Sequence, residues 1–123
     1  MQEPFNKINF RSKREFKIAD HIRKTVSEIV RAKVRDPRVN TVTITDVEIT
    51  YDITIAKIFY SVYPWSENNL KDAHAGLHSA KKFIRMQLGK ELTCYRIPEL
   101  TFKLDTSLDH GDRINELLTR VSE

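Results

Sequence analysis

Lysine and arginine side chains form the densest chemical pattern in this sequence. Lys81, Lys82 and Arg85 fall within two turns of a predicted helix, and Lys90 follows on the same helix. Such side chains neutralise phosphates and release counterions, so a cluster of them supplies affinity for nucleic acid without reading its sequence. The alternative interpretation is an ordinary charged helix face in contact with solvent.

A second set of basic residues follows the helical period near the N-terminus. It comprises Arg14, Lys17, Lys24, Arg31 and Arg35, with His21 and Glu28 at intervening positions. We expect Glu28 to pair with Arg31 on the next turn. We favour one positive surface shared by this stripe and the cluster around Lys81, although two separately solvated helices would give the same pattern.

The placement of charge says more than its total. The chain has 123 residues and a formal net charge of +4, which is a weak indication of any partner. Residues 1–38 carry a net +6, residues 39–80 a net −3, residues 81–103 a net +4 and residues 104–123 a net −3. Two basic segments separated by acidic ones are typical of a domain with one positive face.

Patterns for nucleophilic, nucleotide-binding or metal chemistry are missing from the sequence. It contains no G-x-S-x-G, G-x-x-x-x-G-K or G-x-G-x-x-G run. His74 and His78 are four residues apart, but no third ligand accompanies them, so we expect a solvated helix side and neither metal nor cofactor. Cys94 is the only cysteine, which excludes an internal disulfide, and we interpret it as an incidental thiol.

Three carboxylates, Asp46, Glu48 and Asp52, keep one enzymatic alternative open. Carboxylates at strand ends can hold magnesium in nucleases, and Asp46 and Glu48 would point to the same side of a strand. The Asp/Glu-x-Lys pattern that accompanies such sites is missing from the strands, since it occurs only at residues 15–17 on the first helix. We therefore favour a polar outer sheet face and predict no enzyme.

Hydrophobic periodicity predicts the elements that position these residues. Residues 12–34 have the apolar spacing of a helix, which Asp36-Pro37 ends because proline disfavours a helical residue before it. Strands follow over 42–51 and 54–63, and the apolar phase changes after Ile44. That change predicts a bulge near Thr45-Asp46.

The second half of the chain repeats this kind of pattern. Ser66 is a predicted N-cap for apolar positions at helical spacing from Leu70 to Leu88, in one long helix or in two with a kink. A strand over 98–104 and a last helix over 106–121 follow. The order α-β-β-α(α)-β-α predicts a two-layer α+β sandwich, a three-stranded sheet covered by helices on one face.

We expect residues 1–11 to be a loose arm and residues 12–123 to form a single domain. No apolar run is long enough to span a membrane, and the N-terminus has no hydrophobic signal core, which favours a cytoplasmic protein.

Several segments together resemble the ribosome-binding factor A family. The similar segments are residues 34–39, 42–47, 51–53, 56–62, 83–85, 96–102 and 105–107, with Gly111 and Arg113-Ile114. They occur in the family's order over about residues 12–121. The resemblance implies a type II KH-like domain, α-β-β-α-α-β plus a C-terminal helix. It also implies a bacterial factor, not an enzyme, that binds the free 30S subunit and its 16S rRNA near the 5′ end.

Such factors assist late 30S maturation, 16S rRNA processing and cold adaptation alongside assembly GTPases, and we expect a monomer. The open alternative is a general KH-type RNA- or DNA-binding protein without a ribosomal target. Typical KH domains grip RNA at a Gly-x-x-Gly loop, which this chain lacks, and the family instead kinks its central helices at Ala-x-Gly. Here that segment is Ala80-Lys81-Lys82, so a lysine replaces the glycine and puts the kink in question.

We predict that rRNA contacts fall mainly on Arg38, Lys81, Lys82, Arg85 and Lys90. The helical stripe of Arg14, Lys17, Lys24, Arg31 and Arg35 is a secondary set. A role for Arg96 in rRNA contact stays open, because its side chain could pair with Glu99 or Asp105 instead. Phe59 and Tyr63 are candidates for stacking on bases, although packing or plain exposure explains them as well.

Overall fold

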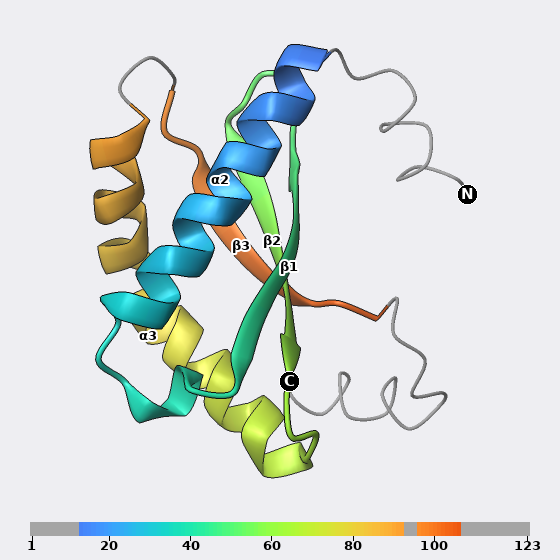
Figure 1. Cartoon of the computed structure of the whole chain (residues 1–123), viewed down its shortest axis with the longest axis vertical. Helices are drawn as coiled ribbons and strands as arrows, with labels where there is room; N and C mark the ends of the chain where they lie inside the picture. Colours follow the sequence, from blue (N-terminus) through green and yellow to red (C-terminus); the bar gives the residue numbers. More distant parts are fainter. Residues whose placement is uncertain (1–12, 93–95, 107–123) are drawn as a thin grey trace.

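The computed structural model describes residues 13–92 and 96–106 (Figure 1). In chain order the elements are α2 (Lys13–Ala32), the 3-10 helix η1 (Pro37–Val39), β1 (Val42–Ile49), β2 (Ile55–Val62), α3 (Glu67–Glu91) and β3 (Glu99–Leu104). The predicted arm over 1–11 and the predicted last helix beyond Thr106 lie outside the described residues. The other predicted elements are all present.

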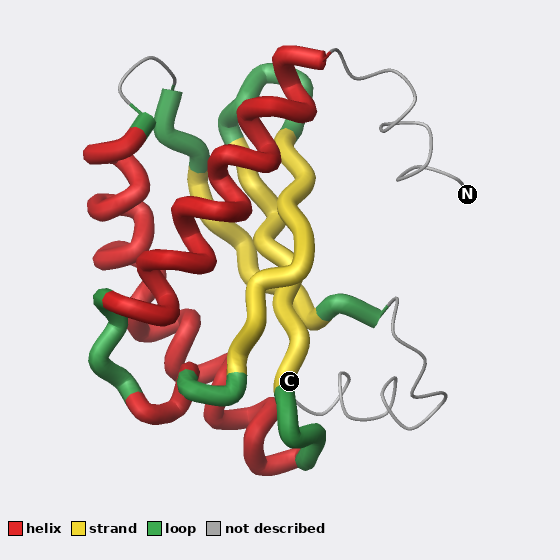
Figure 2. Tube along the Cα trace, in the orientation of Figure 1, coloured by secondary structure: helices red, strands yellow, loops and turns green. Residues whose placement is uncertain are grey.

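The three strands form one sheet in the order β1-β2-β3, with α2 crossing in front of it in Figure 2. β1 pairs with β2 antiparallel, and β2 pairs with β3 parallel. Ile44 lies opposite Tyr60 and Asp46 opposite Phe59, so Thr45 is the extra residue of a bulge. The predicted bulge is confirmed, and it keeps Ile44 and Val47 on the same buried face.

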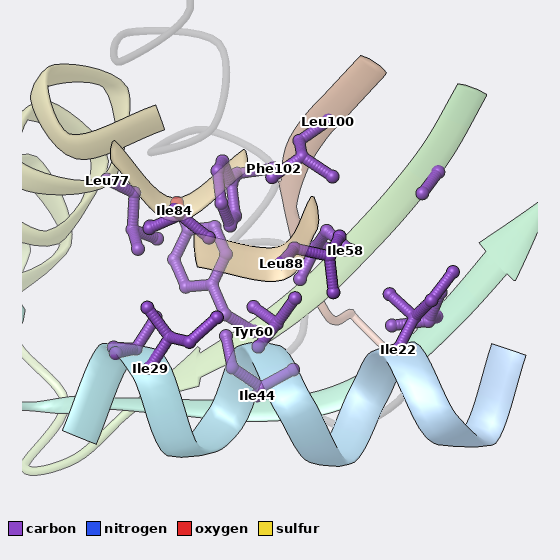
Figure 3. Packing of buried hydrophobic residues seen from close by; sticks show 14 of the residues in the cluster. Ile22, Ile29, Ile44, Ile58, Tyr60, Leu77, Ile84, Leu88, Leu100 and Phe102 are labelled. Atoms are coloured by element: carbon purple, nitrogen blue, oxygen red, sulfur yellow. The ribbon is translucent and has the colours of Figure 1, made fainter. Parts of the chain in front are cut away.

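Each strand buries one of its two faces. On β2 the buried residues are Ala56, Ile58, Tyr60 and Val62, as the alternation predicts, and β3 buries Leu100, Phe102 and Leu104. Both helices contribute to the same hydrophobic cluster, so they cover the same face of the sheet (Figure 3). Tyr60 lies in the middle of this core, and burial raises the pKa of its hydroxyl to about 12.

Helix α2 ends at Ala32, slightly before the predicted end. The amides of Lys33 and Val34 both donate to the Ile29 carbonyl, which closes the last turn. Arg35, predicted as the last member of the helical stripe, therefore lies in the segment after the helix. Asp36 then caps η1, where its side chain accepts from the Arg38 amide.

Helix α3 begins where Ser66 accepts a hydrogen bond from the Asn69 amide, as predicted. Periodicity left one long helix or two with a kink, and α3 is one continuous helix whose axis changes direction between the yellow and ochre parts of Figure 1. Among the described non-glycine residues, only Ile53 has a positive φ. Lys82 therefore takes an ordinary helical conformation, and α3 passes through Ala80-Lys81-Lys82 without a glycine.

Gly76 lets α3 approach η1 closely. A Cβ atom added there would lie 2.8 Å from Val39 Cγ1 and 3.1 Å from Arg38 Cβ. Val39 is buried, with short branched methyl groups that cannot rotate away. The contact therefore sets the position of η1, and of Arg38 within it, relative to α3.

We expect Gly76→Ala to destabilise the protein by about 1–3 kcal/mol, because η1 must move to admit the methyl group. Gly89→Ala is the matched control on the same helix. Its Cβ would meet Ile97 Cδ1 at 2.7 Å, the terminal methyl of a flexible side chain. Alanine's helix propensity of about 1 kcal/mol over glycine then offsets much of the cost. Urea unfolding measures both variants, and equal stabilities would contradict this account of η1.

Candidate nucleic-acid interface

The basic residues of α3 differ in exposure and in their partners. Lys82 and Lys90 are exposed, whereas Lys81 and Arg85 are half-buried. Within the described ranges, no side-chain hydrogen bond or ion pair engages the ammonium groups of Lys81, Lys82 and Lys90. These three ammonium groups are therefore available to an anionic partner.

Arg85 has a different role from the lysines beside it. Its Nε donates to the Pro98 carbonyl and its Nη2 to the Ile97 carbonyl, each at 2.9 Å. Nη2 also lies 3.8 Å from a carboxylate oxygen of Glu99. Arg85 thus connects α3 to the segment that leads into β3, and only part of its guanidinium remains for RNA. Helical spacing could not reveal this contact, because its partners are carbonyls 12 and 13 residues away.

Arg38 is held by Asp36. Its Nε lies 3.1 Å from both carboxylate oxygens, and Nη2 lies 2.7 Å from Oδ2. The side-chain and backbone hydrogen bonds from Arg38 hold the pKa of Asp36 below its usual value. The Arg38 side chain is still 42% exposed, so its guanidinium is oriented without being buried. Since Asp36 occupies the Nε and Nη2 edge, only the remaining Nη hydrogens of Arg38 are left to bind a phosphate.

The α2 stripe is less positive than its sequence suggests. Arg31 pairs with Glu28 at 2.6 Å, as predicted, and Lys24 pairs with Asp20 at 3.2 Å. The hydrogen bond from Arg31 lowers the pKa of Glu28, and those from Arg23 and Lys24 lower the pKa of Asp20. Two of the predicted cations are therefore already paired within their own helix.

The other members of the stripe differ in position. Lys17 and Arg35 are exposed and have no carboxylate partner among the described residues. Arg14 lies in the first turn of α2. Lys17 and Arg35 are thus the members of this set that remain available to an anion.

A groove of about 310 Å³ brings the α2 stripe next to α3. His21, Lys24 and Lys33 line one side, and Gln87 and Glu91 of α3 line the other. Lys33 Nζ donates to Gln87 Oε1 at 3.4 Å. The α2 stripe therefore faces the C-terminal half of α3, where Lys90 lies, whereas Arg85 points toward the start of β3. The two basic segments adjoin without merging into one patch.

The enzymatic alternatives receive no support from the described residues. His74 and His78 stack with ring centroids 4.6 Å apart, and burial together with the charge of His78 lowers the pKa of His74. No three potential ligands among the described residues could hold a metal ion. Asp46 accepts from the Val47 amide and Asp52 from Thr50 and Thr54, so both carboxylates serve local structure. Cys94 lies outside the described residues.

The exposure of Phe59 and Tyr63 agrees with packing and with plain exposure, respectively. Phe59 is half-buried, whereas Tyr63 is 81% exposed. Arg96 is exposed, and within the described residues no ion pair joins it to Glu99 or Asp105. Arg85 approaches Glu99, and Asp105 accepts from Thr45 at 2.6 Å. Tyr51 is 90% exposed in the β1–β2 turn, where Tyr51-Asp52 is predicted to turn the chain. It was not among the predicted contact residues, because its spacing also continues the apolar alternation of β1.

No helix within residues 13–92 or 96–106 has the length and apolarity that a membrane crossing requires. The fold and the surface together define a class of protein: a small two-layer α+β domain, type II KH-like, with basic groups displayed on α3 and on the segment before β1.

Comparison with known proteins identifies the family within this class. A family model for ribosome-binding factor A matches residues 14–118. The ribosome-binding factor A of Pediococcus pentosaceus is 42% identical over 112 residues, covering 91% of this chain and 97% of its own. That of Streptococcus thermophilus is 42% identical over 105 residues, or 85% and 90% of the two chains. The chain belongs to the ribosome-binding factor A family.

Solved structures agree with the fold. The crystal structure of ribosome-binding factor A from Thermus thermophilus superimposes with a TM-score of 0.62 at 19% identity, covering 73% of this chain and 94% of the other. A homology model of the Thermus thermophilus protein, fitted into the cryo-EM map of a 30S complex, superimposes with a TM-score of 0.58 at 19% identity. The match covers 73% of this chain and 93% of the other. The solution structure of a Thermotoga maritima protein superimposes with a TM-score of 0.68 at 29% identity. This match covers 80% of this chain and 93% of the other.

We expect Arg85→Gln to lower the free energy of unfolding by about 1–3 kcal/mol, because two carbonyls beside β3 lose a charged donor. Lys82→Gln, three residues earlier on the same helix, should change it by no more than about 0.5 kcal/mol. Chemical denaturation measures both. Equal stabilities for the two variants would mean that Arg85 does not anchor α3 to β3.

Proposed function

We propose that this chain binds the free 30S small ribosomal subunit through its 16S rRNA, near the 5′ end, and assists late maturation of the subunit. Membership of the ribosome-binding factor A family over residues 14–118 carries the proposal. A relative's structure fitted into a map of a 30S complex supports the same target. The protein would act in the cytoplasm as a non-enzymatic monomer, alongside assembly GTPases, in 16S rRNA processing and cold adaptation.

The contact surface that we propose centres on Lys81, Lys82 and Lys90 of α3, with Arg38 at its edge. Ammonium groups without a carboxylate partner attract phosphates more strongly than paired ones, because binding breaks no ion pair. Arg38 is oriented by Asp36 and held near α3 by the close packing at Gly76. Lys17 and Arg35 form a secondary contact with Arg14, Lys24 and Arg31, while Arg85 acts mainly in the fold.

The proposal is tested by sedimentation of cell extract through a sucrose gradient, with detection of this protein. We expect it to co-migrate with free small subunits and to be absent from complete ribosomes. A position only at the top of the gradient would contradict a ribosomal target.

The remaining alternative is a general KH-type RNA- or DNA-binding protein. Purified protein at one salt concentration distinguishes the two, with free 30S subunits and unrelated RNAs of similar length as competing ligands. A ribosomal factor should prefer the subunits, whereas a general binder would retain all of these ligands similarly.

A further inference from the structure

The turn between β1 and β2 is held in one conformation by a dense set of hydrogen bonds. The Asp52 carboxylate accepts from Thr50 Oγ1 at 2.9 Å and from Thr54 Oγ1 at 2.7 Å. The amides of Thr54 and Ile55 both donate to Thr50 Oγ1 at 3.1 Å. The turn therefore does not depend on outside contacts for its shape.

Ile53 adds a second constraint to this turn. Its φ is 60°, a value that a β-branched residue rarely adopts. The conformation persists because its amide donates to the Thr50 carbonyl at 2.9 Å and its side chain packs partly against the core. With Ile53 directed inward, the preceding Tyr51 lies 90% exposed on a rigid support.

Among the described residues, Tyr51 shares this end of the molecule with two other exposed apolar side chains. Phe16, on the first turns of α2, is 45% exposed, and Ile55, at the start of β2, is 41% exposed. Figure 1 shows that the N-terminal end of α2 and the β1–β2 turn lie at the same end of the sheet.

The charge of the neighbouring sequence favours a nucleic acid over a protein as the occupant. Residues 13–17, in the first turns of α2, include three basic residues and one acidic residue, and the exposed Lys17 directly follows Phe16 in the sequence. Protein interfaces are depleted of lysine at their centre. Aromatic rings next to basic groups are instead typical of sites for single-stranded nucleic acid, where bases stack on the rings and phosphates lie near the cations.

We propose that Tyr51 is a stacking platform for an unpaired base of single-stranded RNA, with Phe16 and Ile55 as its apolar surroundings. This inference rests on the proposed function and adds a second contact, at a different end of the sheet from η1 and Arg38. Stacking contributes affinity without neutralising phosphate, so it should be separable from the contribution of the lysines.

The test measures the affinity of the full chain for a short, unstructured, fluorescein-labelled single-stranded RNA over a series of salt concentrations. We expect Tyr51→Ala to weaken binding about 5-fold or more, since stacking is worth at least about 1 kcal/mol per base. The slope of log affinity against log salt should stay unchanged, because no phosphate contact is lost. Tyr51→Phe should bind like the unmodified chain, because it keeps the ring.

Tyr51→Phe is the matched control for the ring, since it changes only the hydroxyl group at the same exposed position. The thermal unfolding midpoints of both variants should equal that of the unmodified chain.

Several outcomes would overturn the proposal, and one would overturn only the proposed function. Unchanged affinity in Tyr51→Ala would exclude stacking, and an equal loss in Tyr51→Phe would assign the effect to the hydroxyl group. If Tyr51→Ala bound RNA normally but failed to co-sediment with small subunits, this end would contact protein instead. If the unmodified chain bound no single-stranded RNA, stacking would be excluded. If the chain did not co-sediment with small subunits but Tyr51→Ala still weakened RNA binding, only the proposed function would be contradicted.

Discussion

The parallel pairing of β3 with β2 determines where the candidate interface can lie. Antiparallel strands can be joined by a short turn, but parallel strands require a long crossover connection. Here the crossover is α3, which must pack on the apolar face of the sheet because β2 and β3 bury only that face. Arg85 then connects α3 to the carbonyls just before β3. The outer surface of α3, with Lys82 and Lys90, is exposed as a consequence.

The same packing explains how Arg38 comes close to this surface. Gly76 leaves room for η1 against the first half of α3, and Asp36 orients the guanidinium of Arg38 within η1. Arg38 therefore lies next to the first half of α3, although the two segments are far apart in the sequence. The charges on α2 contribute less, because Lys24 and Arg31 already have acidic partners one turn away.

Most of the fold could be predicted from the sequence, because local patterns govern it. Alternation at Ala56, Ile58 and Tyr60 specifies the buried face of β2, and the change of phase after Ile44 requires the bulge. The Ser66 side chain caps α3 by accepting from the Asn69 amide, only three residues further along the chain. The site was less predictable, because its contacts join residues that are distant in the sequence. Arg85 donates to carbonyls 12 and 13 residues further along the chain, and Gly76 packs against Val39. Helical spacing alone treats Arg85 and Lys82 as equivalent, although the first anchors the fold.

The central claim is that the unpaired lysines of α3 bind rRNA phosphates, and the salt dependence of binding to purified 30S subunits tests it most directly. Replacement of Lys81, Lys82 and Lys90 together by glutamine should reduce the magnitude of the log affinity–log salt slope by about 2 to 3, since each phosphate contact contributes about 0.7 to 0.9. A variant with Lys57, Lys71 and Lys103 replaced by glutamine loses the same charge elsewhere and should keep the original slope. Equal slopes for the two triple variants would contradict the claim.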